Sequence, residues 1–414
     1  MEMRYDLATN FDDELLKKVG EFGVVKSVYG KLASDIVGGG RPTFNLPKIS
    51  KKELEGHVST AHDNNIKFSY LFNALCSDNR EFVSKSNKEI RSFVKYLGGI
   101  GVDVITVASP FMLRLVKETS PEIDVSISIY DDLDSFDRIR SWQDLGADEL
   151  TLHYSFNRNF PKLKTALQMT DMNLRIIANN TCLHECIYRS NHANALAHSS
   201  QSKHESGGFF LDFYSLNCGK EKLQSPGKLI AADWIRPEDV HYYEELCDSI
   251  GKTNLSLKLT DRSRPTDWLV GVVKAYAEKS YDGNLFDILN YRNKEFSRID
   301  KTPFIKGALL GKARVDKMRA MQDAVFPPRA YIDNKSLNGF MKPFINGHDC
   351  SSKVCDISGF HDDQKLDLEN ACRYCRNIAE NHLSFEGGED ARREYLGKAN
   401  NSVKDMTNGE MFEK

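Results

Sequence analysis

The sequence predicts an α/β fold, a TIM-type (β/α)8 barrel with an insertion before the seventh predicted strand and a small cysteine-rich C-terminal module. Short β-branched or apolar runs alternate with charged segments of helical period over roughly the first 260 residues. Several of the runs follow Gly-containing turns, as expected of parallel strands joined by crossover helices. About eight such units over roughly 250 residues fit a closed barrel better than an open sheet.

Eight segments are predicted as strands, because each is short, apolar or β-branched, and set between turn or helix signals. In chain order they are Gly23–Val28, Lys67–Phe72, Asp103–Ala108, Asp124–Ile129, Glu149–His153, Leu174–Ala178, Lys228–Ile235 and Asn254–Leu259. The helices predicted between them include Lys51–Asn64, Ser86–Leu97, Pro110–Thr119 and Asp132–Asp144. The stretch from Cys186 to Pro226 is polar and rich in His, Ser and Gly, so it is predicted to be the insertion.

Beyond the last predicted strand the pattern changes. Trp268–Lys279 and Leu285–Arg292 are predicted helices, and a turn signal at Asp282–Asn284 separates them. The predicted organisation is a barrel domain at 1–290, a connecting segment at 291–329, a cysteine-rich metal-binding module at 330–385 and a polar tail at 386–414. The tail is expected to end in mobile residues.

The bulk composition is that of a globular protein, with 40% hydrophobic and 28% charged residues. A net charge of −3 gives no chain-wide field that would attract nucleic acid, although a local basic patch stays open. The first residues contain no apolar signal core, and no run of about 18 apolar residues predicts a membrane span. We therefore expect a cytoplasmic chain without a membrane partner, whose nine cysteines stay reduced.

Four cysteines are predicted to meet at the mouth of the barrel. Cys182 and Cys186 are four residues apart after the sixth predicted strand, Cys76 follows the second, and Cys218 lies in a turn-like part of the insertion. Loops at the carboxyl ends of barrel strands share one mouth, so these thiolates can converge on a 4Fe–4S cluster or a zinc ion. The alternative is a set of unrelated thiols, with Cys76 the one that a buried structural role suits best.

A second cysteine set is compact and consists of Cys350, Cys355, Cys372 and Cys375, the last two in a Cys-x2-Cys arrangement. Four thiolates at this spacing commonly fold a small module around zinc or an iron–sulfur cluster, and spacing alone does not separate the two. The alternative is a cysteine-rich surface module without metal. Cys247 lies in a predicted helix and is expected in the core.

Polar residues at the predicted strand ends suit a pocket at the same mouth. Lysine and arginine can bind carboxylates there, asparagine can hydrogen-bond a substrate, and histidine can move protons near neutral pH. The predicted substrate-binding residues are Asn179, Arg236, Lys258 and Arg262, and the predicted catalytic residues are His153, His192 and His198. The alternatives are structural histidines, and arginines that are paired with Glu238, Asp239 or Asp261.

Seven stretches together resemble one known family. They are Gly38–Pro42, Phe68–Ala74, Val104–Pro110, Asn179–His192, Trp234–Asp239, Leu257–Arg262 and Tyr281–Asn284. In their order and spacing they are similar to the collagenase-like peptidases, family thirty-two among the peptidases of unknown catalytic type. The resemblance implies a barrel with an iron–sulfur cluster on Cys76, Cys182, Cys186 and Cys218. It also implies oxygen-independent hydroxylation of tRNA, ribosomal RNA or the ubiquinone ring, with prephenate as the oxygen donor.

The leading hypothesis is therefore an iron–sulfur enzyme that modifies an acceptor without molecular oxygen, by hydroxylation with prephenate or a similar carboxylated donor. The acceptor, whether small molecule, peptide or RNA, stays open, and an electron donor or partner protein is compatible with the cluster. The cysteine arrangement after the sixth predicted strand and the cysteine-rich tail depart from the hydroxylating branches of the family. Two alternatives remain, a collagenase-like peptidase and a non-catalytic iron–sulfur electron carrier or scaffold.

Overall fold

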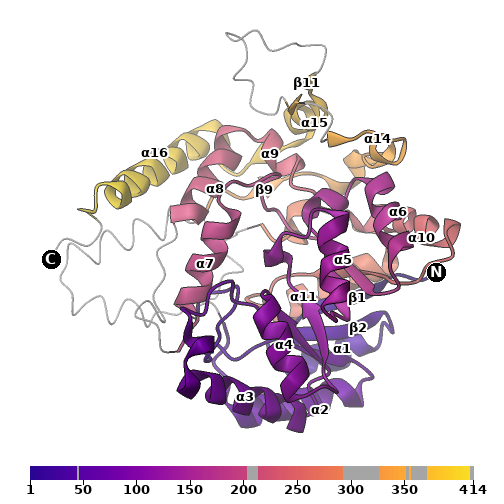
Figure 1. The fold of residues 1–414 in the computed structure, drawn as a ribbon. Coiled ribbons are helices and arrows are strands. Elements are labelled where there is room, and N and C mark those ends of the chain that lie inside the picture. Colours follow the sequence, from indigo (N-terminus) through magenta and orange to yellow (C-terminus); the bar gives the residue numbers. More distant parts are fainter. Residues whose placement is uncertain (44–45, 203–212, 292–325, 351–353, 356–370, 411–414) are drawn as a thin grey trace.

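A closed barrel of eight parallel strands forms the centre of the protein in the computed structural model (Figure 1). The structure describes residues 1–43, 46–202, 213–291, 326–350, 354–355 and 371–410. The barrel strands are β1 (Arg4–Ala8), β2 (Val25–Gly30), β3 (Lys67–Phe72), β4 (Val104–Val107), β5 (Asp124–Ile127), β6 (Glu149–Thr151), β7 (Asn173–Ile177) and β8 (Leu255–Leu259). Strands pair in chain order, and β1 pairs with β8 to close the barrel.

Helices surround the barrel and fill the segments beyond it. The helices of the barrel region are α1 (Asp13–Gly20), α2 (Lys51–Asp63), α3 (Ser84–Gly99), α4 (Pro110–Thr119), α5 (Phe136–Asp144), α6 (Phe160–Met169), α10 (Val240–Ser249) and α11 (Thr266–Glu278). The insertion carries α7 (Arg189–Ser199), α8 (Phe213–Gln224) and α9 (Gly227–Ile230). The C-terminal part contains β9 (Ala330–Tyr331), α14 (Lys342–Ile345), β10 (Val354–Cys355), β11 (Ala371–Cys372), α15 (Tyr374–His382), β12 (Ser384–Phe385) and α16 (Gly388–Thr407).

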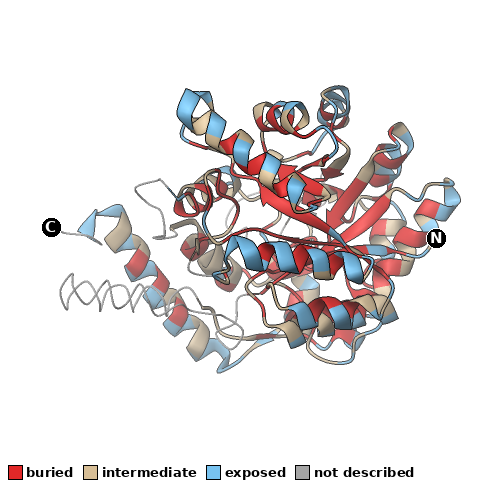
Figure 2. Cartoon of the chain, turned by 90° about the horizontal axis from the view of Figure 1, so that it is seen from below, coloured by how far each residue is buried: buried red, intermediate tan, exposed pale blue. Residues whose placement is uncertain are grey.

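Helix α2 shows how the sequence specifies one of these elements. Ser50 and Glu53 form a capping box that satisfies backbone N–H groups at the start of the helix. Leu54 and Val58, one turn apart, are then buried against the barrel, while the opposite side of the helix stays exposed. Figure 2 shows the same division on other outer helices, which are buried on one face and exposed on the other around strands that are mostly buried.

The closed barrel confirms the predicted fold class, but the sequence interpretation misses one strand. β1 (Arg4–Ala8) is absent from the predicted strands, and the first six predicted strands are β2 to β7. The charged residues Arg4 and Asp6 interrupt the apolar pattern of β1, and Asp6 is fully buried inside the barrel. A strand whose inner face carries a charge does not show the apolar alternation that predicts strands.

The predicted strand at Lys228–Ile235 is wrong. Its first residues belong to helix α9, and the residues that follow form no strand. Leu229, Ile230 and Trp234 are each fully buried, so the segment is apolar on all sides, and periodicity cannot distinguish such a run from a strand. The insertion therefore precedes the eighth strand of the barrel, not the seventh.

The insertion and the chain end pack together. Cys218 lies within helix α8, not in the predicted turn, and Leu216 and Leu223 of α8 form a small cluster with Tyr395 and Ala399 of α16. The predicted polar tail thus contains a 20-residue helix, α16, which lies beside α8 (Figure 1). Its apolar stripe is short, which is why composition indicates a mobile tail.

Two further predictions concern the segment after the barrel. The predicted helix at Leu285–Arg292 is a single 3-10 turn at Leu285–Asp287 in its described part. Residues 292–325 of the predicted connecting segment lie outside the described residues. None of the described helices combines the length and the apolar character needed to cross a membrane.

Candidate functional site

The inside of the barrel carries charges where most such barrels carry branched apolar side chains. Arg175 of β7 lies 3.3 Å from Asp6 of β1 and 3.0 Å from Glu149 of β6, and Lys26 lies 3.4 Å from Glu149. Alternation along the strands places these groups on the inner face. Two carboxylates and two cations balance one another in this layer.

Lys258 of β8 adds a further cation to the interior. Its side chain is buried, and its Nζ lies 3.8 Å from the centre of the Tyr29 ring. Within the described residues it has no hydrogen bond and no carboxylate within ion-pair distance. Burial, together with the neighbouring Arg175, lowers the pKa of Lys258 to about 7.

Arg262 follows β8 and is a second cation without a carboxylate partner among the described residues. It is 5% exposed, and its Nη1 is buried without a hydrogen-bond partner there. Burial and the neighbouring Arg41 lower the pKa of Arg262 to about 10. The nearest acidic residue in sequence, Asp261, is already engaged by Arg41 at 3.2 Å.

The neighbouring charges at the mouth are paired. Lys31 and Asp35 form a buried ion pair at 2.9 Å. Burial would raise the pKa of Asp261, but Arg41 and Arg264 outweigh it and hold that pKa well below its usual range. Lys258 and Arg262 thus differ from these neighbours in having no ion pair among the described residues, and buried charges are costly unless something compensates them.

Two of the predicted substrate-binding residues, Arg236 and Asn179, are hydrogen-bonded to groups of the protein itself. Arg236 forms two hydrogen bonds of 2.8 Å to Asp239 and a third of 3.1 Å to the carbonyl of Asn334, so its nitrogens are all engaged. Asn179 donates to the carbonyl of Thr260 and accepts from the backbone N–H of Thr260. It joins the ends of β7 and β8 and has no polar atom left for a substrate.

Three of the predicted mouth cysteines lie near one another, and Cys182, Cys186 and Cys218 are called the mouth cysteines below. Burial raises the pKa of Cys186 to about 11, and the nearby Cys218 and Cys182 raise it further. Arg189, at the start of α7, lies beside Cys182 and Cys186 and 3.3 Å from Asp132. A neighbouring guanidinium favours the thiolate that a metal requires.

Cys76 is not brought to the mouth cysteines by any described contact. Its Sγ accepts a hydrogen bond from the backbone N–H of Asp78 at 3.4 Å, and its carbonyl accepts one from Gln201. Gln201 lies just beyond α7, so Cys76 reaches the far end of the helix that starts after Cys186.

The three predicted catalytic histidines occupy two places. His153 follows β6; burial and the neighbouring Arg189 lower its pKa to about 4, so the ring is neutral near pH 7. Its Nδ1 accepts from the backbone N–H of Ser155. His192 and His198 lie on α7, where His192 Nε2 is 3.3 Å from the Ser215 hydroxyl of α8. No described contact joins them to Lys258 or Arg262.

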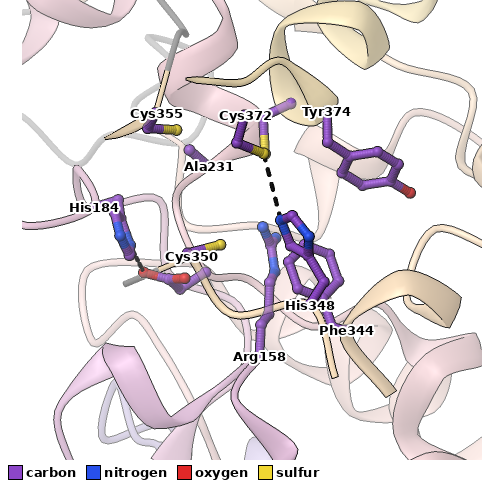
Figure 3. Close-up of a pocket in the computed structure, with 11 residues that line it drawn as sticks. Arg158, His184, Ala231, Phe344, His348, Cys350, Cys355, Cys372 and Tyr374 are labelled. Atoms are coloured by element: carbon purple, nitrogen blue, oxygen red, sulfur yellow. Dashed lines mark hydrogen bonds and ion pairs between the residues drawn. The ribbon is translucent and has the colours of Figure 1, made fainter. Parts of the chain in front are cut away.

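The second cysteine set lines a single pocket between the barrel and the C-terminal module (Figure 3). Cys350, Cys355, Cys372 and Cys375, called the tail cysteines below, line it together with Arg158, His184, Asp233 and His348. Strands β10 and β11 place Cys355 directly opposite Cys372, and His348 Nε2 lies 3.4 Å from the sulfur of Cys372.

The thiols of the tail set influence one another. Burial raises the pKa of Cys350 to about 12, and Cys355 and Cys372 contribute to the increase. The pKa of Cys375 is also raised, first by burial and then by the other three thiols. In the part of the chain that is described, no three potential ligands already stand in metal-binding geometry. The donor types fit zinc or an iron–sulfur cluster, and such small sites close around their ion on binding.

Sequence reasoning did not assign an arginine to either cysteine set. Arg189 accompanies the mouth cysteines and Arg158 the tail cysteines. Arg158 follows a predicted strand, and Arg189 comes three residues after Cys186. These sequence positions were the signal that could have placed both arginines at the sites. Their roles depend on the fold, because Arg158 and Cys375 are 217 residues apart in the sequence.

The chain is similar to known proteins over its barrel. Residues 37–176 match the model of peptidase family U32, a range that includes Cys76 and ends before Cys182. An uncharacterized protease of Methanocaldococcus jannaschii is 28% identical over 256 residues, which cover 62% of this chain and 73% of the relative. A solved structure of a U32 peptidase is 19% identical in sequence, and its match spans 63% of this chain and 93% of the U32 peptidase chain, with a TM-score of 0.47.

A weaker match has a more specific name. The tRNA hydroxylation protein P of Haemophilus influenzae is 22% identical over 153 residues, which cover 35% of this chain and 31% of that relative. The chain thus spans about a third of this protein. Together the matches confirm the predicted resemblance to the collagenase-like peptidase family.

Proposed function

From its resemblance to peptidase family U32, we propose that this protein is an iron–sulfur enzyme that modifies an acceptor without molecular oxygen. The proposed reaction is hydroxylation, with prephenate or a similar carboxylated molecule as donor. The similarity to a tRNA hydroxylation protein supports this class of reaction, and the acceptor can be RNA, a peptide or a small molecule. The proposal places the chain in the cytoplasm, where thiols stay reduced and an electron donor is at hand.

The mouth cysteines are the proposed ligands of the cluster. Three thiolates on a 4Fe–4S cluster leave one iron for a non-thiolate ligand, and the bound cluster supplies a Lewis acid and a one-electron redox centre. Arg189 offsets the negative charge of Cys182 and Cys186. His153 is neutral near pH 7 and can serve as a hydrogen-bond partner at the same mouth.

Lys258 and Arg262 are the proposed binding groups for the donor. Tyr130 lies near both Arg262 and Cys182, since both influence the pKa of its hydroxyl. Arg41 is fixed by Asp261 and keeps that carboxylate from neutralising Arg262. A donor with two carboxylates would supply the missing negative charge and align its reacting part toward Cys182.

The observation that carries this proposal is the pair of buried cations without a carboxylate partner in the described chain. A structural lysine or arginine at this depth is normally paired. The surrounding pairs, Lys31 with Asp35 and Arg41 with Asp261, follow that rule. Lys258, within β8, and Arg262, three residues beyond the end of β8, both depart from it.

Calorimetric titration with prephenate tests the anion site. Arg262→Ala and Lys258→Met should each weaken binding about tenfold or more, because each removes a charge-assisted hydrogen bond. Lys252→Met is the matched control, since Lys252 pairs with the exposed Asp171 far from any proposed ligand, and it should bind as the wild type does. Equal affinity in all four proteins, or no binding to any of them, contradicts the assignment.

A peptidase is the second candidate, because the Methanocaldococcus jannaschii relative is described as a protease. The two functions differ in their need for iron. Peptide cleavage that persists after the iron is removed by a chelator would establish the peptidase and reject the hydroxylase. Loss of a donor-dependent modification in the same sample, without any cleavage, supports the hydroxylase.

A further inference from the structure

Arg158 is a buried cation whose hydrogen-bond partners are all neutral. It follows β6 and is 4% exposed. Its Nη1 donates to the carbonyl of Ile230 at 2.8 Å, and its Nε and Nη2 donate to the carbonyl of Trp234 at 3.2 and 2.8 Å. Within the described residues no carboxylate comes within ion-pair distance of it.

Aromatic rings remove Arg158 from water without neutralising it. The centres of the Trp234, Phe340 and Phe344 rings lie 4.5, 4.8 and 5.6 Å from its guanidinium carbon. A guanidinium has five N–H groups, and three are donated to the two carbonyls. Two N–H groups of a buried cation therefore remain available on the wall of the pocket.

The acidic group nearest this wall is already occupied. Asp233 accepts a hydrogen bond of 2.7 Å from Nδ1 of His184. The same contact lies within ion-pair distance, so the Asp233 carboxylate is engaged by a residue other than Arg158. Figure 3 shows His184 on one side of the pocket and Arg158 directed toward Cys350 and His348 on the other.

The tail cysteines supply what Arg158 lacks. Three elements present them, since Cys355 and Cys372 face each other on β10 and β11, and Cys375 is buried at the start of α15. Asp349, beside Cys350, accepts a hydrogen bond of 3.1 Å from Asn159, the residue after Arg158. Arg158 lines the same pocket as all four of these cysteines.

We propose that the tail cysteines bind one metal centre, zinc or an iron–sulfur cluster, and that Arg158 of the barrel is its counter-charge. Four thiols that bind one divalent ion release four protons, which leaves the site with a net charge of −2. A buried dianion next to a buried, unpaired guanidinium stabilises both, and N–H groups directed at thiolate sulfur tune such a centre. The site uses cysteines other than the mouth cysteines and does not depend on the proposed hydroxylation.

The metal site is tested in the full chain with Cys182→Ser and Cys186→Ser, which removes the mouth site from the measurement. After anaerobic purification this background should retain zinc or iron, and elemental analysis distinguishes the two. Adding Cys372→Ser and Cys375→Ser should release that metal. A background that holds no metal, both as purified and after addition of Co²⁺, overturns the proposal.

The role of Arg158 is tested in the same background by titrating the metal-free protein with Co²⁺ and following the thiolate-to-cobalt absorption. Arg158→Met should weaken the affinity about tenfold or more, and Arg158→Lys should restore most of it because the charge returns. Phe344→Leu is the matched control, since it loosens the same aromatic packing without a change of charge, and it should weaken the affinity less than about threefold.

Two results would overturn the counter-charge role. One is unchanged Co²⁺ affinity in Arg158→Met. The other is an equal loss of Co²⁺ affinity in Arg158→Met and Phe344→Leu, which would mean that Arg158 acts through packing and not through its charge. If Arg158→Met does not fold, as judged by circular dichroism, Arg158→Gln replaces it in the comparison with Arg158→Lys. Equal affinities of the Gln and Lys variants would then reject the role of the charge.

Discussion

A buried lysine or arginine without a carboxylate partner is the most informative single-residue feature of this protein. Desolvation of such a charge destabilises the fold unless another group compensates it. Lys258 and Arg262 face this cost at the barrel mouth, and Arg158 faces it beside the tail cysteines. In both places the missing partner is negative, which is why we assign a carboxylated molecule to one and a thiolate-bound metal to the other.

The lowered pKa of Lys258 makes a pH dependence testable at this scale. The amine is charged below about pH 7 and neutral above it, so affinity for a carboxylate donor should fall as the pH rises through 7. Prephenate titrations between about pH 6 and about pH 8 should show this loss in the wild type, approaching tenfold per pH unit at the upper end. Lys258→Met should show a flat, weak profile. Parallel profiles in the two proteins would contradict the assignment.

The same pKa has a consequence for stability in the unliganded protein. The unfolded chain binds a proton at Lys258 up to about pH 10.4, whereas the folded chain releases it above about pH 7. Between these values the unfolded state holds more protons, so this group makes the free energy of unfolding rise with pH there. Lys258→Met should remove that slope, which urea unfolding at several pH values can measure.

At the scale of elements, the contact between α8 and α16 connects the insertion with the chain end. A Cβ atom at Gly219 would overlap the hydroxyl of Tyr395, so the two helices approach at a residue without a side chain. Leu216, Leu223 and Ala399 pack around that point. Because Cys218 is next to Gly219, the position of α16 also influences a proposed ligand of the cluster.

Gly219→Ala tests this contact. The overlap should lower the free energy of unfolding by about 1–3 kcal/mol and expose α16 to limited proteolysis. Adding Tyr395→Phe, which removes the hydroxyl, should recover part of the loss. Gly397→Ala on α16 is the control, since no described atom outside the backbone of α16 lies within 4 Å of its Cβ position, and it should be neutral or stabilising by about 0.5–1 kcal/mol. Equal effects of the two Ala substitutions would contradict the close approach.

At the scale of the whole molecule, the sequence predicts those strands and helices whose local apolar pattern determines them. The strands β2 to β7 and β8, and helices such as α4, follow from periodicity and capping, and the barrel follows from their alternation. β1 was lost because Asp6 belongs to the charged interior, and Lys228–Ile235 was misread because it is buried on every side.

For the candidate sites, the sequence predicts which cysteines group together but not which arginines are paired. Three of the four cysteines predicted at the mouth lie near one another, as expected for loops at one end of a barrel, and the tail cysteines share one pocket. Whether an arginine is free or paired is a different kind of fact. Arg236 and Arg262 both lie close to acidic residues in the sequence. In the structure Arg236 forms an ion pair with Asp239, whereas Asp261 pairs with Arg41 and not with Arg262. Only the side-chain arrangement separates them.

The central claim is that the mouth cysteines hold an iron–sulfur cluster, and iron and sulfide analysis tests it most directly. The measurement uses anaerobically reconstituted chains carrying Cys372→Ser and Cys375→Ser, so that the tail site does not contribute. This background should hold about four irons and four sulfides. Adding Cys182→Ala should remove them while circular dichroism stays unchanged, whereas adding Cys247→Ala, in the core, should not. Full iron and sulfide retention with Cys182→Ala, and likewise with Cys186→Ala, would contradict the account.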